Sequence, residues 1–337
     1  MSTRTLRVGL VGAGRMGHAH AEFLREEPDV QITAVCNWSL PRAEEMAAEW
    51  GAQVYTSHRE MLRNEDFDAV YVCTPTYNHA EIALGVLEKG IPAFLEKPIS
   101  LDLPLMGALW RLAQQRNSLV SVAFHWRYTR ACQEAQRLIG DEAIAMVNLH
   151  WYWTRPPVRW MWNRALAGGQ IVDQNIHLVD LSQALAGDVD TVYACYNERQ
   201  SNFDDGFDNW DAYALTLRYK SGAVGNCTGT YALYPEIQDP ATADFALRDR
   251  LLRITEAGLD VMTPSGVEHT PNQGAFRAGV NRAFIEAVRT GDPTPLRAGL
   301  WEGIHSTAVV LAANHSARTG LPVKVDAFLE QQAGIKR

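Results

Sequence analysis

The feature that most constrains the fold is a regular alternation of short apolar runs with amphipathic stretches over the first part of the chain. Within this part of the chain, Ser57 and Glu60 have the spacing of a capping box, which predicts the start of a short helix. Strands alternating with helices of this length form a parallel sheet covered on both faces, which binds ligands beyond the carboxyl ends of its strands. The predicted strands are 8–11, 31–36, 69–73, 93–96 and 119–124, and the longer helices are 15–26, 41–50 and 77–89.

The pattern changes after about residue 126, where several apolar runs are joined by short turns such as 220–222 and 256–258. Short connections indicate antiparallel neighbours. We therefore expect an α/β Rossmann domain over residues 1–125 and an α+β domain with an open, mainly antiparallel sheet over residues 126–337, whose C-terminal helix can pack back on the first domain. Its predicted strands are 146–154, 191–197, 212–219, 223–231, 251–255 and 259–262, and its helices are 131–138, 170–185, 279–289 and 300–319.

Composition excludes several classes of protein. The net charge is −8, from 31 basic and 39 acidic residues, which argues against a nucleic-acid or anionic-membrane partner. The five cysteines are widely spaced and form no C-x-x-C pair, so they suggest neither a disulfide framework nor a zinc site. No secretory signal or membrane span is evident, and we expect a cytoplasmic protein.

Residues 12–17 read Gly-Ala-Gly-Arg-Met-Gly and match G-x-G-x-x-G in its required context, after a strand and at the start of a helix. Gly12 allows the tight turn, Gly14 lets the backbone approach a pyrophosphate, and Gly17 permits close packing of helix on strand. The helix N-terminus, with Arg15 and Met16, supplies donors and a positive dipole end. This pattern predicts a site for NAD or NADP.

The residue that reads the adenosine ribose follows the second strand, and here it is Asn37. An aspartate would accept two ribose hydroxyls and repel a 2′-phosphate, whereas an asparagine does not repel it. Ser39, Arg42 and Arg15 are candidates to meet a phosphate, although Arg42 is equally well explained as a solvated helix residue. Trp38 could stack on the adenine or cap the surface. The choice between NAD and NADP stays open on the sequence.

Two further motifs suggest chemistry. Glu96-Lys97-Pro98 begins at the end of the predicted strand 93–96, and a lysine at the end of that strand can stabilise charge on a substrate oxygen. On a helix, Asp173 and His177 share a face, with Asp180 one turn further, and a carboxylate beside an imidazole makes a suitable proton acceptor. Taken alone, the lysine could be a surface residue and the histidine a satisfied core residue. A metal set of Asp173, His177 and Asp180 is the least favoured alternative, because no other ligand cluster completes it.

The segment 150–164 is rich in aromatic and basic residues. Aromatic faces with arginines suit a polyhydroxylated ligand, but tryptophan is also enriched at subunit interfaces, so both interpretations stay open. Its aromatic residues are Trp151, Tyr152, Trp153, Trp160 and Trp162.

These motifs, in this order, resemble the Gfo/Idh/MocA oxidoreductase family over nearly the whole chain. The quoted motifs are residues 12–17, 74–79 (Thr-Pro-Thr-Tyr-Asn-His), 96–98, 124–128 (Phe-His-Trp-Arg-Tyr) and 168–180. The resemblance implies that Lys97, Asp173 and His177 serve the reacting carbinol, with His177 as acid or base. It also implies that the 74–79 loop lies along the cofactor, through Thr74, Pro75, Asn78 and His79, with Glu96 and Lys97 beside it. We predict substrate contacts from His125, Arg127, Trp153 and Trp162, besides Asp173 and His177.

The resemblance predicts an NAD(P)-dependent dehydrogenase of a sugar, polyol or sugar derivative, assembled as a homodimer or homotetramer through the C-terminal sheet. Two alternatives are a transient-oxidation glycosidase or epimerase with no net NAD turnover, and a non-catalytic dinucleotide-binding regulator. Three departures from the family's pattern stand out: Asn37 replaces an aspartate, and Gln170 and Asn175 stand where glycines are frequent.

Overall fold

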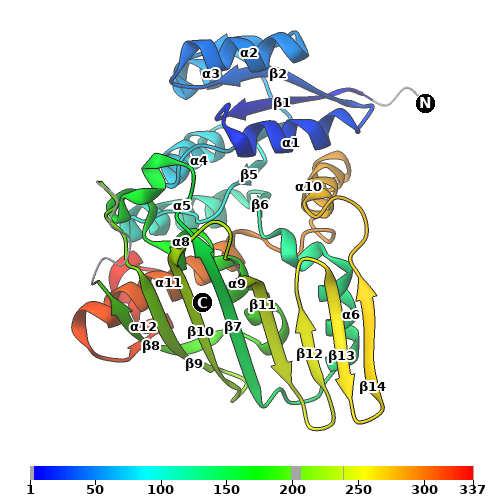
Figure 1. Cartoon of the computed structure of the whole chain (residues 1–337). Coiled ribbons are helices and arrows are strands. Elements are labelled where there is room, and N and C mark those ends of the chain that lie inside the picture. Colours follow the sequence, from blue (N-terminus) through cyan, green and yellow to red (C-terminus); the bar gives the residue numbers. More distant parts are fainter. Residues whose placement is uncertain (1–3, 199–205, 238, 337) are drawn as a thin grey trace. The chain divides into compact units, whose positions relative to one another are not determined.

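The computed structural model describes residues 4–198, 206–237 and 239–336, which form two compact units. The first unit takes in the described residues up to Ala123 together with Ala278–Trp301. The second takes in Phe124–Arg277 and the described residues from Glu302 onward. Figure 1 labels most of the helices and strands of both units.

The first unit is built on a six-stranded sheet in the order β3-β2-β1-β4-β5-β6, in which all neighbours are parallel. This order confirms the predicted doubly wound sheet. Only β3 was not predicted, because it is a short edge strand without an apolar run. The strands are β1 (Leu6–Val11), β2 (Val30–Cys36), β3 (Gln53–Tyr55), β4 (Ala69–Val72), β5 (Ala93–Leu95) and β6 (Val120–Val122).

The helices of the first unit begin where the sequence supplies start signals. The Ser57 side chain accepts a hydrogen bond from Glu60 N at the start of α3, as the capping box predicts, and Asp102 does the same for α5, a helix that we did not predict. Helix α10 packs against α1, so residues 278–301 complete this unit. The helices are α1 (Arg15–Arg25), α2 (Leu40–Trp50), α3 (His58–Asn64), α4 (His79–Glu88), α5 (Leu103–Arg116) and α10 (Ala278–Thr290).

The second unit is built on a nine-stranded sheet in the order β14-β13-β12-β11-β7-β10-β9-β8-β15. Strands β7 and β10 are parallel and the other neighbours are antiparallel, which confirms the predicted mainly antiparallel sheet. The strands are β7 (Met146–Thr154), β8 (Val189–Asn197), β9 (Ala212–Tyr219), β10 (Val224–Leu233), β11 (Asp239–Ala246), β12 (Leu251–Ile254), β13 (Gly258–Thr263), β14 (Gly266–Pro271) and β15 (Val323–Lys324).

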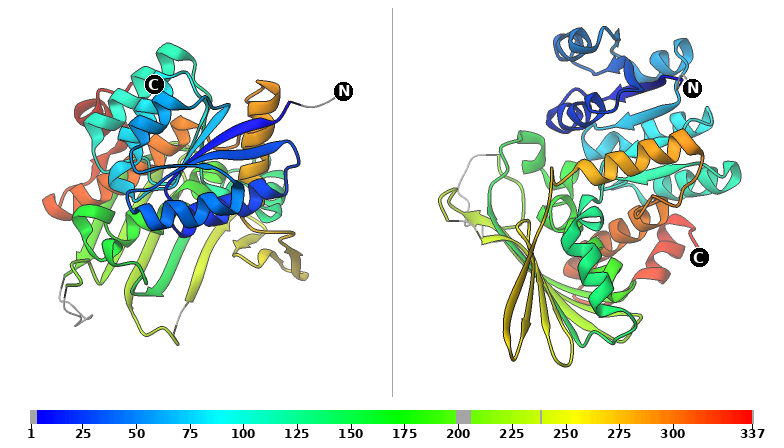
Figure 2. Two further views of the ribbon diagram at one scale, coloured as in Figure 1. Left: turned by 90° about the horizontal axis from the view of Figure 1, so that it is seen from above. Right: turned by 90° about the vertical axis from the view of Figure 1, so that its right-hand side faces the viewer.

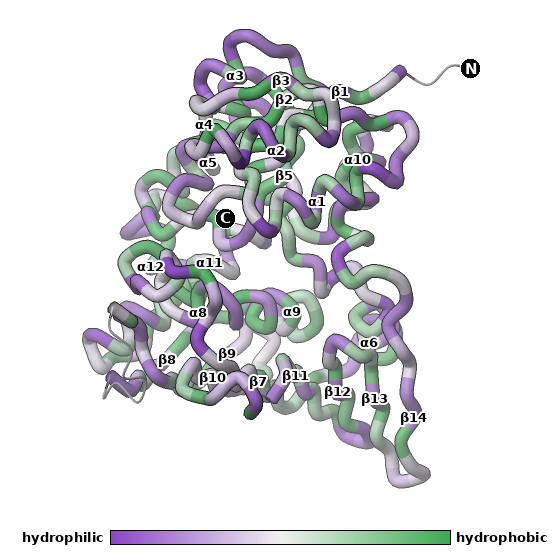
Figure 3. Tube along the Cα trace, turned by 45° about the horizontal axis from the view of Figure 1, so that its top comes forward, coloured by the Kyte–Doolittle hydropathy of each residue, from purple (hydrophilic) through white to green (hydrophobic). Residues whose placement is uncertain are grey.

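The helices of the second unit cover one face of this sheet, and among the described residues no helix covers the other face (Figure 2). Residues of β9 accordingly alternate between buried and exposed. In Figure 3, hydrophobic colour marks α9, most of which is buried against β7 and β11. The helices are α6 (Arg130–Ile139), α7 (Arg164–Ala167), α8 (Gln170–Asp173), α9 (Ile176–Ala186), α11 (Leu300–Thr319) and α12 (Val325–Ala333).

Candidate active site

The glycine loop between β1 and α1 is shaped to receive a pyrophosphate. Gly12 has a φ of 110°, and a Cβ on it would lie 2.6 Å from the Cys73 carbonyl carbon. A Cβ on Gly17 would lie 2.0 Å from the Gly12 oxygen, whereas a Cβ on Gly14 would meet nothing within 4 Å. No side chain caps the N-terminus of α1, and its first turn holds no acidic residue. The loop therefore fits a dinucleotide, with donors and open space where the phosphates would lie.

Asn37 joins this loop to the one that follows β2. Its Oδ1 accepts a hydrogen bond from Ala13 N at 3.2 Å, and its Nδ2 donates to the Ser39 carbonyl at 3.1 Å. Trp38 beside it is 81% exposed. Arg15 and Arg42 are exposed as well, and Met16 is half-buried.

The predicted Glu96-Lys97-Pro98 turn follows β5 and is held by a buried network. His20 Nε2 lies 2.9 Å from Glu96 Oε1, and His20 Nδ1 lies 2.9 Å from Asn281 Oδ1 on α10. Glu96 Oε2 accepts from Lys97 N. Burial alone would raise the pKa of Glu96, but its hydrogen bond with His20 and the charges of His20, Lys97 and His79 lower it to about 2. The Glu96 carboxylate therefore holds the turn that carries Lys97, rather than facing solvent.

His79 of the 74–79 loop links that loop to the Glu96-Lys97-Pro98 turn. Its Nδ1 lies 2.8 Å from the Pro98 carbonyl and its Nε2 lies 2.6 Å from the Thr74 carbonyl, and the ring is buried. Burial lowers the pKa of His79, and the two carbonyls oppose that effect. Both ring nitrogens thus bridge the two loops, while Thr74, Pro75 and Asn78 are half-buried.

The single helix predicted for residues 170–185 is wrong, because the chain turns between α8 and α9. Asn175 N donates to the Gln170 carbonyl and His177 N to the Gln174 carbonyl, so the regular i to i−4 ladder is broken. The Gln170 amide donates to the Thr230 carbonyl at 3.0 Å, and that of Asn175 to the Thr228 carbonyl at 3.2 Å. The two residues that depart from the family's glycines therefore fasten this turn to β10.

The turn places His177 beside His125. Their ring centroids lie 4.5 Å apart with the planes tilted by 56°, and both residues are buried. Phe124 meets the His177 ring edge-on, and Phe276 meets that of His125. Asp173 is buried at the end of α8. Two predicted substrate residues from separate segments, His125 and His177, thus meet within the second unit.

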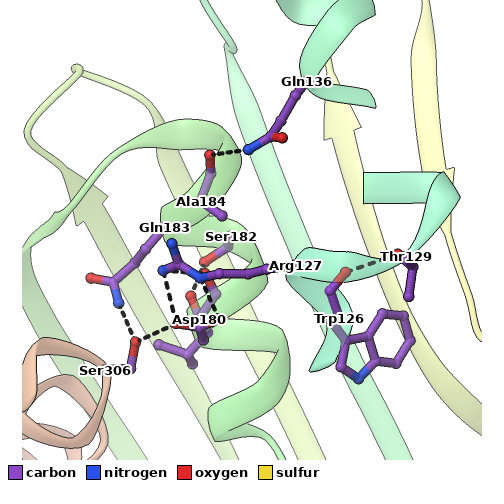
Figure 4. Close-up of polar contacts among 10 residues, drawn as sticks. Trp126, Arg127, Thr129, Gln136, Asp180, Ser182, Gln183, Ala184 and Ser306 are labelled. Carbon is purple, nitrogen blue, oxygen red and sulfur yellow. Dashed lines mark hydrogen bonds and ion pairs between the residues drawn. The ribbon is translucent and has the colours of Figure 1, made fainter. Parts of the chain in front are cut away.

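Asp180 does not belong to this group, which corrects the expectation that it shares the face of Asp173 and His177. Its carboxylate is fully buried and accepts two hydrogen bonds from Arg127, each 2.8 Å long, and one from Ser306 Oγ at 3.0 Å (Figure 4). Burial raises the pKa of Asp180, opposed by Arg127. Arg127 lies two residues after His125, so the ion pair ties the segment that carries His125 to α9.

The aromatic and basic segment runs along β7 into a short 3₁₀ turn, Arg159–Trp162. Trp162 is buried with Phe207 and Tyr231, and Trp153 packs against this cluster. The guanidinium carbons of Arg155 and Arg159 lie 4.4 and 4.5 Å from the Trp162 ring centroid, at cation–π distance. Burial raises the pKa of Tyr231, and the negative charge of the Asp173 carboxylate raises it further.

Sequence reasoning missed the residues that support the site, above all His20 and Asn281. A signal for His20 was present, because Gly17, His20 and Leu24 fall on the buried face of α1 at helical spacing. No such signal pointed to Asn281, which lies far along the chain. Among the described residues no group of three or more His, Cys, Asp or Glu side chains could hold a metal ion, and no helix is long and apolar enough to cross a membrane.

Comparison with known proteins supports the same two-part architecture. A model described as "Oxidoreductase family, NAD-binding Rossmann fold" matches residues 6–124, and the "GFO/IDH/MocA C-terminal domain" matches residues 133–243. The scyllo-inositol 2-dehydrogenase (NAD(+)) of Bacillus subtilis is 26% identical, over 95% of this chain and 96% of that protein. The levoglucosan dehydrogenase of Pseudarthrobacter phenanthrenivorans is 28% identical, over 67% and 68%.

Solved structures show the same fold. Levoglucosan dehydrogenase in complex with NADH superimposes with a TM-score of 0.85 at 21% identity, covering 96% of this chain and 99% of that one. The family model of the Rossmann domain and the dehydrogenases among the relatives identify the chain as a nicotinamide-dependent oxidoreductase. The chain belongs to the Gfo/Idh/MocA oxidoreductase family, as its motifs predict.

Proposed function

We propose that this protein transfers hydride between a secondary alcohol of a sugar, polyol or sugar derivative and a nicotinamide dinucleotide. One observation carries the proposal: the lysine, aspartate and histidine of the family's motifs are all present, as Lys97, Asp173 and His177. The inositol and levoglucosan dehydrogenases among the relatives support a polyhydroxylated substrate. The aromatic and basic cluster around Trp162 suits the same class, since sugars offer both apolar CH faces and hydroxyls.

The dinucleotide, when bound, supplies the hydride acceptor or donor. In the oxidation, His177 accepts the hydroxyl proton. The family's motif assigns to Lys97 the stabilisation of negative charge on a substrate oxygen. Asp173 orients the reacting groups. In the reduction, His177 returns the proton to the carbonyl oxygen as the hydride is added to its carbon. We propose that His125, Trp153 and Trp162 contact the substrate, whereas Arg127 holds α9 through Asp180.

The roles of Lys97 and His177 are tested by substitution. Lys97→Ala and His177→Ala should each abolish turnover on a substrate found by screening polyols, sugars and sugar acids with NAD and NADP. Dinucleotide affinity, followed by fluorescence of the reduced cofactor, should stay nearly unchanged. Lys89→Ala and His269→Ala are matched controls, because both residues are exposed and lie outside the proposed site. Unimpaired turnover in the Lys97 and His177 variants would reject the assignment.

The same screen addresses the alternatives. A product formed without any change in reduced-cofactor absorbance would indicate transient oxidation and exclude a simple dehydrogenase. Dinucleotide binding with no turnover across the full panel would favour a regulator.

We further propose that the protein forms a homodimer or homotetramer through the uncovered face of its nine-stranded sheet. Met146 and Val224 are paired on neighbouring strands there and are 46% and 51% exposed, and Tyr193 on β8 is 40% exposed. Apolar residues exposed on one sheet face indicate an interface. Light scattering should show an oligomer that Val224→Glu weakens, and a monomeric wild-type protein would refute this.

The cysteines are free and four of the five are buried, which supports a reducing, cytoplasmic location.

A further inference from the structure

The loop after β2 is the place where Rossmann units contact the adenosine ribose of the dinucleotide. In Rossmann units an acidic residue at this position hydrogen-bonds the ribose 2′-hydroxyl and repels a 2′-phosphate. Here the residue is Asn37, and its side chain is held by two backbone contacts. A carboxylate could accept from Ala13 N, but it could not donate to the Ser39 carbonyl as the Asn37 amide does. The loop is therefore built around a neutral side chain.

The groups that follow Asn37 favour an anion. Ser39 is the N-cap of α2, but its hydroxyl makes no capping hydrogen bond, so it is available to a ligand. Arg42 lies in the first turn of the same helix, is exposed, and forms no ion pair with any residue that the structure describes. The first turn of α2 contains no acidic residue. A phosphate beside Ser39 would thus meet a hydroxyl and a guanidinium, the group that proteins use most for this purpose.

Arg15 adds a second positive charge at the same edge of the sheet. It is the first residue of α1, directly after the glycine loop, and it is exposed without an ion pair among the described residues. The contact from Ala13 N to Asn37 holds the two loops together, 3.2 Å apart at these atoms. Burial raises the pKa of Cys36 at the end of β2, and the negative charge of the Glu60 carboxylate raises it further. Glu60 lies on α3, however, and not on either loop.

We infer that Asn37, Ser39 and Arg42 form a subsite for the 2′-phosphate of NADP, and that the protein binds NADP(H) in preference to NAD(H). This inference rests on the dinucleotide site of the first unit, and it does not depend on the substrate or on the catalytic roles proposed above. Trp38 offers an aromatic face to the adenine of either dinucleotide and does not discriminate between them.

The test is equilibrium binding of NADPH and NADH to the full chain, followed by fluorescence without substrate. We expect NADPH to bind at least about tenfold more tightly, as a charge-assisted hydrogen bond provides. Arg42→Ala should weaken NADPH by about tenfold and leave NADH unchanged. Asn37→Asp should invert the preference. Arg63→Ala is the matched control, since Arg63 is an exposed arginine on α3, and it should leave the ratio of the two affinities unchanged.

Equal or tighter binding of NADH by the wild-type protein would overturn the inference, as would an Arg42→Ala variant that weakens both dinucleotides alike. Binding of neither dinucleotide would overturn the site itself. By contrast, the expected NADPH preference in a protein inactive on every sugar and polyol would uphold this subsite while the proposed function fails.

Discussion

Replacing Glu96 with glutamine isolates the charge that holds the Lys97 turn. Glutamine keeps the size of the side chain and an oxygen to accept from Lys97 N, but it removes the negative charge beside His20. The pKa of Glu96 falls from an ordinary value of 4.5 to about 2 in the fold. A difference of that size corresponds to about 3 kcal/mol in favour of the ionised form. We expect Glu96→Gln to lower the free energy of unfolding at pH 7 by about this amount.

The direction of this pKa shift predicts how the stabilisation by Glu96 depends on pH. Because the folded-state pKa of Glu96 lies below the unfolded one, the ionised carboxylate stabilises the fold fully above pH 4.5. This stabilisation is lost as the pH falls toward about 2. In urea denaturation followed by circular dichroism, the free energy of unfolding should therefore differ between wild type and Glu96→Gln by a constant amount from pH 7 to 5. Below pH 5 this difference should shrink.

Glu81→Gln is a matched control, since Glu81 forms an exposed ion pair with Arg59 that is worth less than about 1 kcal/mol. A stabilising charge on Glu96 is refuted if Glu96→Gln lowers the free energy of unfolding no more than Glu81→Gln does. It is also refuted if the difference from wild type does not change with pH.

Three other perturbations follow from named contacts. Arg127→Met leaves the buried Asp180 charge unpaired and should cost about 3–5 kcal/mol of stability. Adding Asp180→Leu should recover most of that loss in thermal denaturation; no recovery would contradict the role of charge burial. Gly17→Ala should destabilise the first unit, because its Cβ would lie 2.0 Å from the Gly12 oxygen. Gly14→Ala should leave the melting temperature nearly unchanged but weaken dinucleotide binding, and unchanged affinity would show that no ligand approaches Gly14.

Most of the fold could be predicted because burial leaves a periodic trace in the sequence. Apolar runs predicted β1, β4 and β5, a β-rich run predicted β2, and the short turn between two strand-like runs predicted the antiparallel neighbours β9 and β10. Strand β11 escaped prediction because its sequence, Asp-Pro-Ala-Thr-Ala-Asp-Phe-Ala, carries a proline and two aspartates. Its central position satisfies these groups through neighbours that the local sequence does not reveal; Asp244, for instance, pairs with Arg253 on β12.

The site could be predicted only in part, for a similar reason. Motifs identify residue types at fixed spacing, and they selected Lys97, Asp173 and His177 together with the glycine loop. They could not show that the chain breaks between α8 and α9, because that break depends on the Gln170 and Asn175 amides bonding to the backbone of β10. Such contacts join residues more than fifty positions apart, and helical periodicity carries no information about them.

Histidines show most clearly what the structure adds to a motif. His20 and His79 lie in or beside family motifs and, from sequence alone, either could be a proton acceptor. Each has both ring nitrogens within hydrogen-bond distance of buried protein groups, His20 with Glu96 and Asn281 and His79 with two backbone carbonyls. Neither therefore has a nitrogen left for a substrate hydroxyl. We assign the proposed proton transfer instead to His177, which lies beside His125 in the second unit.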